Sequence, residues 1–385
     1  MIIIGLIIFI YSYGQSSVDA VLREIERNNP ELKAASAGLD EERLANRSEA
    51  LLDNPEVEFN YLWGAENIGG RHDVRVTQAI DIPTLTGMKS GKTAYLDELS
   101  ALKYEAERME VMQEARKLCV GLTYCNALLQ ELTKHLSSSG ALVDSYEKRM
   151  AAGESTVLDL NKAKLHLTSV KGQVNQAESE RQSLLARLRT LNGGKAIEFD
   201  DTSYDPSETL PVDFETWFAE ASEKIPVLEY VRKEVQLGQQ QLAIDKASGW
   251  PELTVGYMSE IRTVEKFRGV TVGLNIPLWS GANKVKRSRA GVAAAESRQQ
   301  AAELEFYGRL KDLYRQAAAM KNNSEMMRAS LVDTDNRDFL LSALTRGEIS
   351  MIDYLVENDL YYDALKQTLE AEREYRYSLA ALKVF

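Results

Sequence analysis

The chain contains few of the residues that staple small proteins together or hold metal ions. Its 385 residues include two cysteines, Cys119 and Cys125, and three histidines, His72, His135 and His166. Six residues along a helix correspond to about 9 Å of rise, so the cysteines are too far apart for a disulfide. The histidines are scattered, and no Cys or His spacing suits a metal cage. We therefore expect packing to supply the stability, and we expect neither a metal site nor a cofactor.

Positive charge is also in deficit. The chain has 46 Lys and Arg residues against 58 Asp and Glu residues, which gives a net charge of -12. Nucleic-acid binding draws its affinity from clustered Lys and Arg, so this balance argues against a nucleic-acid partner. It is compatible with a cationic cargo. No Ser/His/Asp or paired-carboxylate arrangement stands out in the sequence, and we predict no enzyme activity.

Long apolar runs are missing, apart from a short one at the N-terminus. Residues 1–13 supply about a dozen apolar residues, whereas a helix needs about 20 to cross the core of a bilayer. Ser12 and Gly14 then provide the small residues of a signal-peptide cleavage site. We interpret residues 1–14 as a secretory signal peptide, which predicts export from the cytoplasm.

The rest of the sequence is a tandem duplication. Pro30 corresponds to Pro226, 196 residues later, and Gly153 corresponds to Gly347, 194 residues later. The octapeptide NPEVEFNY, which ends at Tyr61, likewise matches WPELTVGY in the second half. A matched offset over this length indicates one structural unit repeated in tandem.

Each repeat has the pattern of a short helix, two strands, a long helix, a sharp break and a shorter helix. The first repeat, 15–192, has strands at about 55–63 and 72–82 and long helices at 84–150 and 155–191. A connector rich in Gly, Pro and Asp covers 193–212. The second repeat, 213–385, has strands at about 251–259 and 268–276 and long helices at 282–346 and 349–382. Apolar residues recur along the long helices at alternating steps of four and three, which is typical of a coiled-coil seam.

The strands alternate between apolar and polar residues. The apolar positions, which we expect to face lipid, are Val57, Phe59, Tyr61, Trp63, Leu253, Val255, Tyr257, Val270, Val272 and Leu274. Strands of about ten residues with one apolar and one charged side match a membrane barrel with a wet lumen, whereas a soluble sheet packed on a core is the alternative. Single-chain barrels begin at 8 strands, and lipid does not tolerate an open edge. We therefore predict a barrel shared between chains, in which three copies contribute about 12 strands.

The chain resembles the TolC-type outer-membrane efflux channel family, the outer membrane factors of tripartite efflux systems. The resemblance rests on the duplicated unit, the IPLWSG run at 276–281 and the paired tips MAAGESTVLDL at 150–160 and LTRGEISMIDYL at 344–355. It implies a mainly α-helical homotrimer, with a 12-stranded β-barrel in the outer membrane joined to a long α-helical coiled-coil barrel in the periplasm.

The resemblance also implies a function. The trimer would be an exit duct for small solutes, metal cations or drugs, that arrive from an inner-membrane pump through a periplasmic membrane-fusion adaptor. An outlet for type I protein secretion is a second role within the same class. A soluble periplasmic coiled-coil scaffold or adaptor is the alternative outside it.

The family's functional positions fall at the two helix breaks. The resemblance places the adaptor contact at a periplasmic tip formed by Met150, Ala151, Ala152, Gly153, Leu344, Arg346 and Gly347. Asp353 matches the first of two aspartates that ring the constriction in the family, but the second position, three residues on, is Val356. Asp159 and Glu357 are further candidates for negative charge at this constriction. The other interpretation is that these acidic residues lie on the solvated face of a coiled coil.

Overall fold

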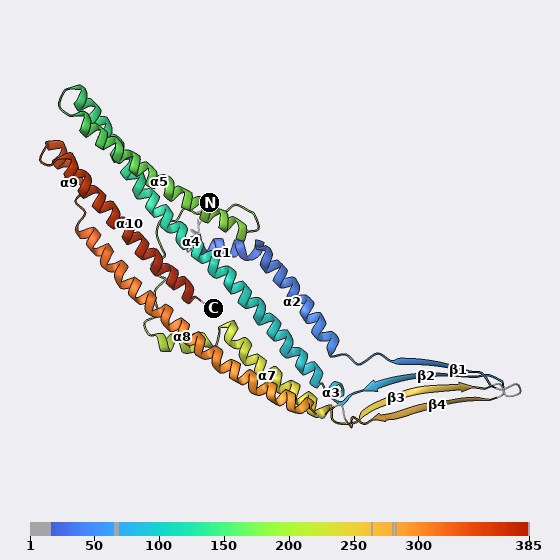
Figure 1. Cartoon of the computed structure of the whole chain (residues 1–385). Helices are drawn as coiled ribbons and strands as arrows, with labels where there is room; N and C mark the ends of the chain where they lie inside the picture. The colour runs from blue at the N-terminus through green and yellow to red at the C-terminus, as the bar shows by residue number, and fades with distance from the viewer. Residues whose placement is uncertain (1–16, 65–68, 263–264, 279–280, 282, 384–385) are drawn as a thin grey trace, which may run out of the picture. The chain divides into compact units, whose positions relative to one another are not determined.

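A computed structural model describes residues 17–64, 69–262, 265–278, 281 and 283–383 (Figure 1). The predicted signal peptide, residues 1–14, lies outside the described residues. The chain divides into two compact units, and each unit contains segments of both repeats. Among the described residues, the helical unit consists of 17–33, 108–219 and 308–383, and the strand unit consists of those within 34–107 and 220–307.

The strand unit contains the sheet. Its strands are β1 (Glu56–Leu62), β2 (Arg71–Ile80), β3 (Glu252–Ile261) and β4 (Lys266–Asn275), each within two residues of the range expected from the alternation. They pair antiparallel in the order β1-β2-β3-β4, so the strands of the two repeats pair with each other through β2 and β3 (Figure 1). The outer edges of β1 and β4 are unpaired among the described strands.

Residue Gly256 permits the close approach of β2 and β3. A Cβ atom at this position would lie 2.5 Å from the carbonyl oxygen of Val76 and 2.8 Å from the side chain of Thr77. Because carbon and oxygen atoms cannot approach that closely without a shift of the backbone, the pairing of the two repeats depends on a glycine here.

Helices complete the strand unit. They are α2 (Pro30–Glu49), α3 (Ile82–Leu85), the first part of α4 (Met88–Ala151), α7 (Pro226–Ala247) and the first part of α8 (Lys284–Asp333). Polar contacts join α2 to α4: the Thr93 hydroxyl donates to the carbonyl of Asn46 at 3.1 Å, and Lys103 pairs with Glu42 at 3.0 Å. The pKa of Glu42 is lowered by hydrogen bonds from Ser100 and Lys103.

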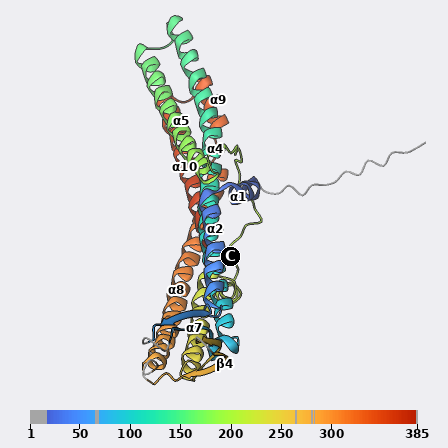
Figure 2. The same ribbon diagram turned by 90° about the vertical axis from the view of Figure 1, so that its right-hand side faces the viewer.

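The helical unit is built on the predicted seam. It contains α1 (Ser17–Asn28), the rest of α4, α5 (Val157–Leu191), most of α6 (Phe214–Ser222), the rest of α8, α9 (Arg337–Arg346) and α10 (Met351–Leu382). Figure 2 shows α5 running alongside α4. Cys119 and Cys125 are free and buried in this core, and burial raises the pKa of each thiol to about 12. None of the described helices is long and apolar enough to cross a bilayer.

Two of the predicted long helices are shorter than expected. The helix expected at 282–346 is interrupted, because α8 ends at Asp333 and α9 begins at Arg337. Two hydrogen bonds from the Arg337 guanidinium to Asp335, at 2.9 and 2.8 Å, hold the break in place. The helix expected at 84–150 begins at Met88, since Gly87 has a left-handed φ of 74° that separates it from α3.

Helices α1 and α6 were not expected from the sequence. Val21, Leu22 and Ile25 of α1 are buried in the core of the helical unit, at the i, i+1, i+4 spacing of one helix face. The sequence therefore contains the apolar spacing of an amphipathic helix, but the helix is only 12 residues long and the pattern is short. Helix α6 has 9 residues and follows the connector.

Candidate functional site

One face of the sheet is apolar across all four strands. The register aligns Val57 with Val76, Val76 with Tyr257, and Tyr257 with Val270. The rows toward Ile80 stay mainly apolar, whereas Ser259, Arg268 and Lys266 lie on the same face toward the β3–β4 turn. Side chains alternate between faces along a strand, so every predicted lipid-facing residue within the four strands lies on this face. Trp63 follows the end of β1 and is exposed. Val270 is 81% exposed, and a continuous apolar patch of this kind marks a surface that contacts lipid or another protein.

The opposite face of the sheet is charged. Arg75 pairs with Glu58 at 3.1 Å, and Arg71 bridges Asp73 at 3.5 Å and Glu260 at 3.2 Å. The Arg75–Glu58 and Arg71–Glu260 pairs cross from strand to strand, so the polar face is held by contacts between β1, β2 and β3. The sheet therefore separates an apolar surface from a charged one.

The predicted tip consists of two tight turns. Gly153 and Gly347 have the same left-handed φ, 76°, and each ends a helix. Met150, Ala151, Ala152 and Arg346 are exposed around these glycines. The Arg346 side chain pairs with Glu348 at 2.7 Å.

Leu344 does not belong to this exposed group. Only 6% of the residue is exposed, because it packs in a core that joins α4 and α5 to α9 and α10. The core residues are Leu142, Val143, Tyr146, Leu160, Ala163, Leu340, Leu344, Met351 and Tyr354. The prediction that Leu344 is available to a partner is thus wrong for this structure. Exposed apolar residues beside the turns include Leu158 and Ile352, which occupy equivalent positions in the two repeats.

The candidate constriction residues Asp159 and Asp353 cap helices. The Thr156 hydroxyl donates to Asp159 at 2.6 Å and accepts from its backbone N–H, and Ser350 makes the same pair of bonds with Asp353. The hydrogen bond from Thr156 lowers the pKa of Asp159. The patterns TVLD at 156–159 and SMID at 350–353 are the sequence signal of this capping box. Glu357 is exposed on α10.

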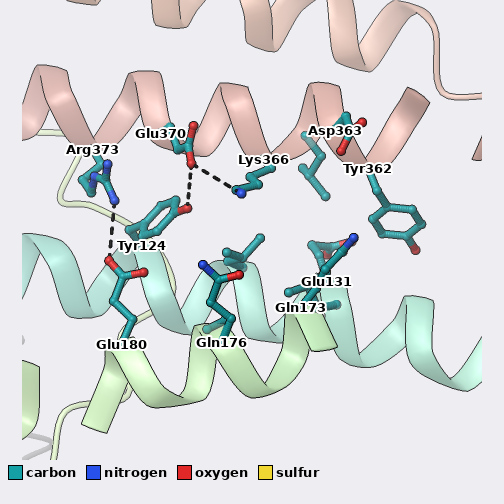
Figure 3. A pocket seen from close by; sticks show the side chains of 14 residues that line it. Tyr124, Glu131, Gln173, Gln176, Glu180, Tyr362, Asp363, Lys366, Glu370 and Arg373 are labelled. Atoms are coloured by element: carbon teal, nitrogen blue, oxygen red, sulfur yellow. Dashed lines mark hydrogen bonds and ion pairs between the residues drawn. The ribbon is translucent and has the colours of Figure 1, made fainter. Parts of the chain in front are cut away.

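A pocket of about 190 Å³ lies between α4, α5 and α10 of the helical unit (Figure 3). Glu370 accepts from the Tyr124 hydroxyl at 3.3 Å and lies 4.0 Å from Lys366. Arg373 lies 3.8 Å from Glu180. The lining carries four carboxylates, Glu131, Glu180, Asp363 and Glu370, and two cationic side chains, Lys366 and Arg373. The excess of carboxylates favours cations, although three of these four carboxylates, Glu131, Glu180 and Glu370, already have a basic partner.

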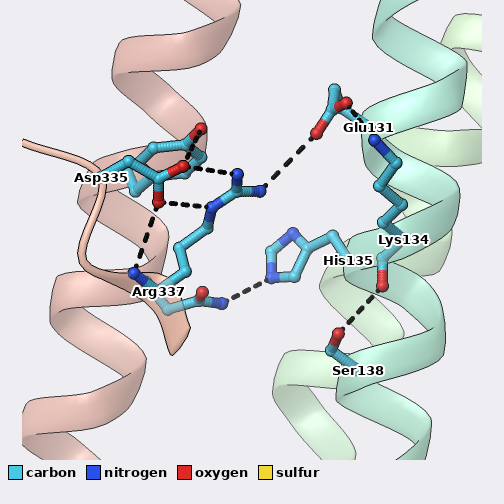
Figure 4. A network of polar contacts seen from close by, with 8 residues as sticks. Glu131, Lys134, His135, Ser138, Asp335 and Arg337 are labelled. Atoms are coloured by element: carbon cyan, nitrogen blue, oxygen red, sulfur yellow. Dashed lines mark hydrogen bonds and ion pairs between the residues drawn. The ribbon is translucent and has the colours of Figure 1, made fainter. Parts of the chain in front are cut away.

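A polar network links the α8–α9 break to α4 (Figure 4). Arg337 binds Asp335 and lies 3.6 Å from Glu131, which also pairs with Lys134 at 2.6 Å. The guanidinium lies 4.1 Å from the ring centre of Tyr361. The hydrogen bonds from Arg337 lower the pKa of Asp335.

Two of the three histidines lie together one helical turn from this network. One ring nitrogen of His135, one of His166 and a carboxylate oxygen of Asp359 are all within 4.8 Å of one another. The spacing of the histidines in the sequence gives no sign of this cluster, because packing α4 against α5 brings together residues 31 positions apart in the sequence. Burial lowers the pKa of His135 to about 4 and also lowers the pKa of His166, so burial favours the uncharged form of both rings.

The His135 ring has one unsatisfied nitrogen. The ring is 1% exposed and stacks on Tyr362, with the ring centres 3.7 Å apart. The Asn358 side-chain nitrogen lies 3.0 Å from Nε2, whereas Nδ1 has no hydrogen-bond partner among the described residues. If the amide donates to Nε2, the ring proton is on Nδ1 and remains buried and unpaired. Such a group costs about 1–3 kcal/mol, so its presence calls for an explanation.

Several solved structures share this fold. The CmeC outer membrane channel of Campylobacter jejuni superposes with a TM-score of 0.72 at 14% identity, covering 96% of this chain and 85% of that one. CusC, whose structures describe transmembrane channel formation, gives 0.73 at 13% identity and coverages of 96% and 91%. The MtrE outer membrane channel of Neisseria gonorrhoeae gives 0.68 at 14% identity and coverages of 95% and 88%. No family model and no curated protein sequence matches.

Proposed function

We propose that this chain, which has the fold of the TolC-type outer-membrane channels, is an exit duct of the bacterial outer membrane whose helical part lies in the periplasm. The observation that carries the proposal is the sheet, which has apolar residues from all four strands on one face and ion pairs that join β1, β2 and β3 on the other. In a barrel wall the apolar face contacts lipid and the charged face lines water. Moving Val57, Val270 and their neighbours from water into lipid is favourable, because it removes apolar surface from water.

The unpaired edges of β1 and β4 make the chain a protomer in this proposal. Open edges cannot face hydrocarbon, because each unpaired N–H and C=O there costs several kcal/mol. Pairing β4 of one copy with β1 of the next closes the barrel. Three copies supply about 12 strands, a number compatible with a water-filled lumen. We therefore propose a homotrimer.

The tip supports docking of a periplasmic adaptor that connects the duct to an inner-membrane pump. Leu158 and Ile352 are exposed at the first turns of α5 and α10, and Met150 and Ala151 are exposed across the turn. Apolar side chains at an exposed helix end suit an adaptor that covers them on binding. The pump provides the energy, and the duct itself needs no catalytic group.

We propose small solutes, metal cations or drugs, as the cargo. The net charge of -12 and the carboxylate excess in the α4–α5–α10 pocket favour cations. A secreted polypeptide is the competing cargo within the same architecture. Growth of a deletion strain on toxic cations and on drugs tests the first two kinds of cargo. A comparison of the proteins secreted by the deletion strain and its parent tests the third, a polypeptide.

Cell fractionation tests the placement. The mature protein is expected in the outer-membrane fraction, extractable only with detergent, and the detergent particle is expected to conduct ions in a planar bilayer. Recovery from the soluble periplasm without detergent would instead identify a coiled-coil scaffold or adaptor and would overturn the proposal.

A further inference from the structure

The three helices α4, α5 and α10 each contribute one side chain with a metal-binding atom to a single point. His135, His166 and Asp359 come from these helices in that order. The Nδ1 atom of His166 lies 3.5 Å from a carboxylate oxygen of Asp359. The His166 side chain is 7% exposed and the Asp359 side chain is 55% exposed, so the cluster has a buried end and an open end. Solute export, as proposed above, does not require any of the three.

We propose that His135, His166 and Asp359 form a binding site for a divalent first-row transition cation of the zinc type. Imidazole nitrogen and carboxylate oxygen are ligands of Zn²⁺, and a site with three protein ligands keeps its fourth position for water. Ligand atoms on a tetrahedral zinc ion are about 3.3 Å apart, close to the 3.5 Å between His166 and Asp359. The ring nitrogen of His135 is within 4.8 Å of the other two ligand atoms, so it needs to approach them by at most about 1.5 Å to reach the same spacing.

The unsatisfied nitrogen of His135 is an independent observation in favour of this site. Coordination through Nδ1 removes the proton that otherwise has no acceptor. A 180° turn of the Asn358 amide then places its oxygen where its nitrogen now lies, 3.0 Å from Nε2. The second ring nitrogen would donate to that oxygen, and this outer hydrogen bond is typical of metal-bound histidine. Tyr362, stacked on the other side, fixes the plane of the ring.

A bound ion would connect the two hairpins of the helical unit. Two ligands come from the α4–α5 hairpin and the third comes from α10, which forms the other hairpin with α9. The hairpins already share an apolar core near their turns. The ion therefore adds a polar link that depends on metal concentration, and this inference holds whether the chain is a duct or a scaffold.

Isothermal titration of the purified full-length protein, stripped with EDTA, with Zn²⁺ alone tests the site. We expect one ion per chain, and we expect His166→Gln and Asp359→Asn each to weaken binding at least about tenfold. The matched controls are His72→Gln, the histidine outside the cluster, and Asp144→Asn, an exposed carboxylate on α4. Both controls should bind as the parent does. Co²⁺ should give the visible absorption of a four-coordinate ion in the parent and lose it in the two ligand variants.

Hydrogen exchange provides a readout of the link between hairpins. Zn²⁺ should slow exchange in α10 near Asp359 in the parent and leave the Asp359→Asn variant unchanged. His135→Gln also tests the buried ligand. If this variant does not fold, the His166→Gln and Asp359→Asn variants decide whether the cluster binds Zn²⁺. Absence of saturable binding, or equal affinity in the parent, the ligand variants and the controls, would overturn the site. These outcomes do not depend on the fractionation result, since the titration needs no membrane.

Discussion

Asp159 and Asp353 each have a structural role, because each belongs to a capping box at the start of a helix. Each aspartate is at the third residue of a helix that starts directly after a left-handed glycine turn, and each closes a capping box with Thr156 or Ser350. The boxes satisfy backbone N–H groups that would otherwise lack partners at the first turns of α5 and α10. A constriction role for these carboxylates stays a prediction, and any substitution there also alters a helix cap.

Removing the capping hydroxyl tests this assignment. Ser350→Ala should destabilise the first turn of α10 by about 1 kcal/mol, because the hydroxyl no longer accepts from the Asp353 N–H. Amide exchange in that turn should accelerate about fivefold. Ser330→Ala, an exposed serine in α8, is the matched control and should leave exchange unchanged. Equal exchange rates in the parent and in Ser350→Ala would show that the cap contributes nothing.

A substitution at Gly256 tests the close approach of β2 and β3. Gly256→Ala places a methyl group against the Val76 carbonyl, and relieving that contact should cost about 1–3 kcal/mol and weaken the β2–β3 pairing. The yield of assembled, heat-resistant oligomer on gels should fall. Gly269→Ala is the control on β4, because a Cβ there meets nothing within 4 Å. Matching yields for the two variants would contradict the argument.

Among the elements, the strands were the most predictable from sequence and the helix ends the least. The alternation of Val57, Phe59 and Tyr61 is a local pattern, and it located β1 to within one residue at each end. The break between α8 and α9 was missed because its cause is partly distant: Arg337 bonds Asp335 nearby and lies beside Glu131 of α4.

Sites that depend on tertiary contacts were correspondingly harder to predict. The pairing of His135 with His166 requires the packing of α4 on α5, which no spacing in the sequence reveals. The burial of Leu344 requires contact between two hairpins. By contrast, the turn glycines Gly153 and Gly347 were evident from the repeat, because both lie at the same offset and both need a left-handed conformation.

Charge placed on one face of the sheet tests the face assignment. Val255→Asp with Val272→Asp puts two carboxylates at opposed positions on the apolar face. Contact with lipid would make each carboxylate costly. A basic residue at the midplane of the bilayer costs about 2–4 kcal/mol, and an acidic residue costs less. We expect loss of membrane insertion. Thr254→Asp with Thr271→Asp changes the same two strands on the polar face and should insert normally. Normal insertion of the valine variant would show that the two faces are wrongly assigned.

At the scale of the whole molecule, duplication explains why the described residues form a sheet of four strands, two from each repeat. Each repeat supplies one hairpin, and β2 and β3 join the hairpins across the repeat boundary. This pairing uses up one edge of each hairpin and leaves β1 and β4 as the edges of the sheet. In lipid those edges have to pair, so the proposed oligomer would follow from hydrogen bonding of the backbone and not from a particular side-chain contact.

Native mass spectrometry of the particle extracted from membranes with detergent tests the shared barrel most directly. We expect three identical chains, which together close about 12 strands and pair β4 of each copy with β1 of the next. A particle that conducts ions as a single chain or as a dimer would contradict it, because four or about eight strands of this kind would then form the pore.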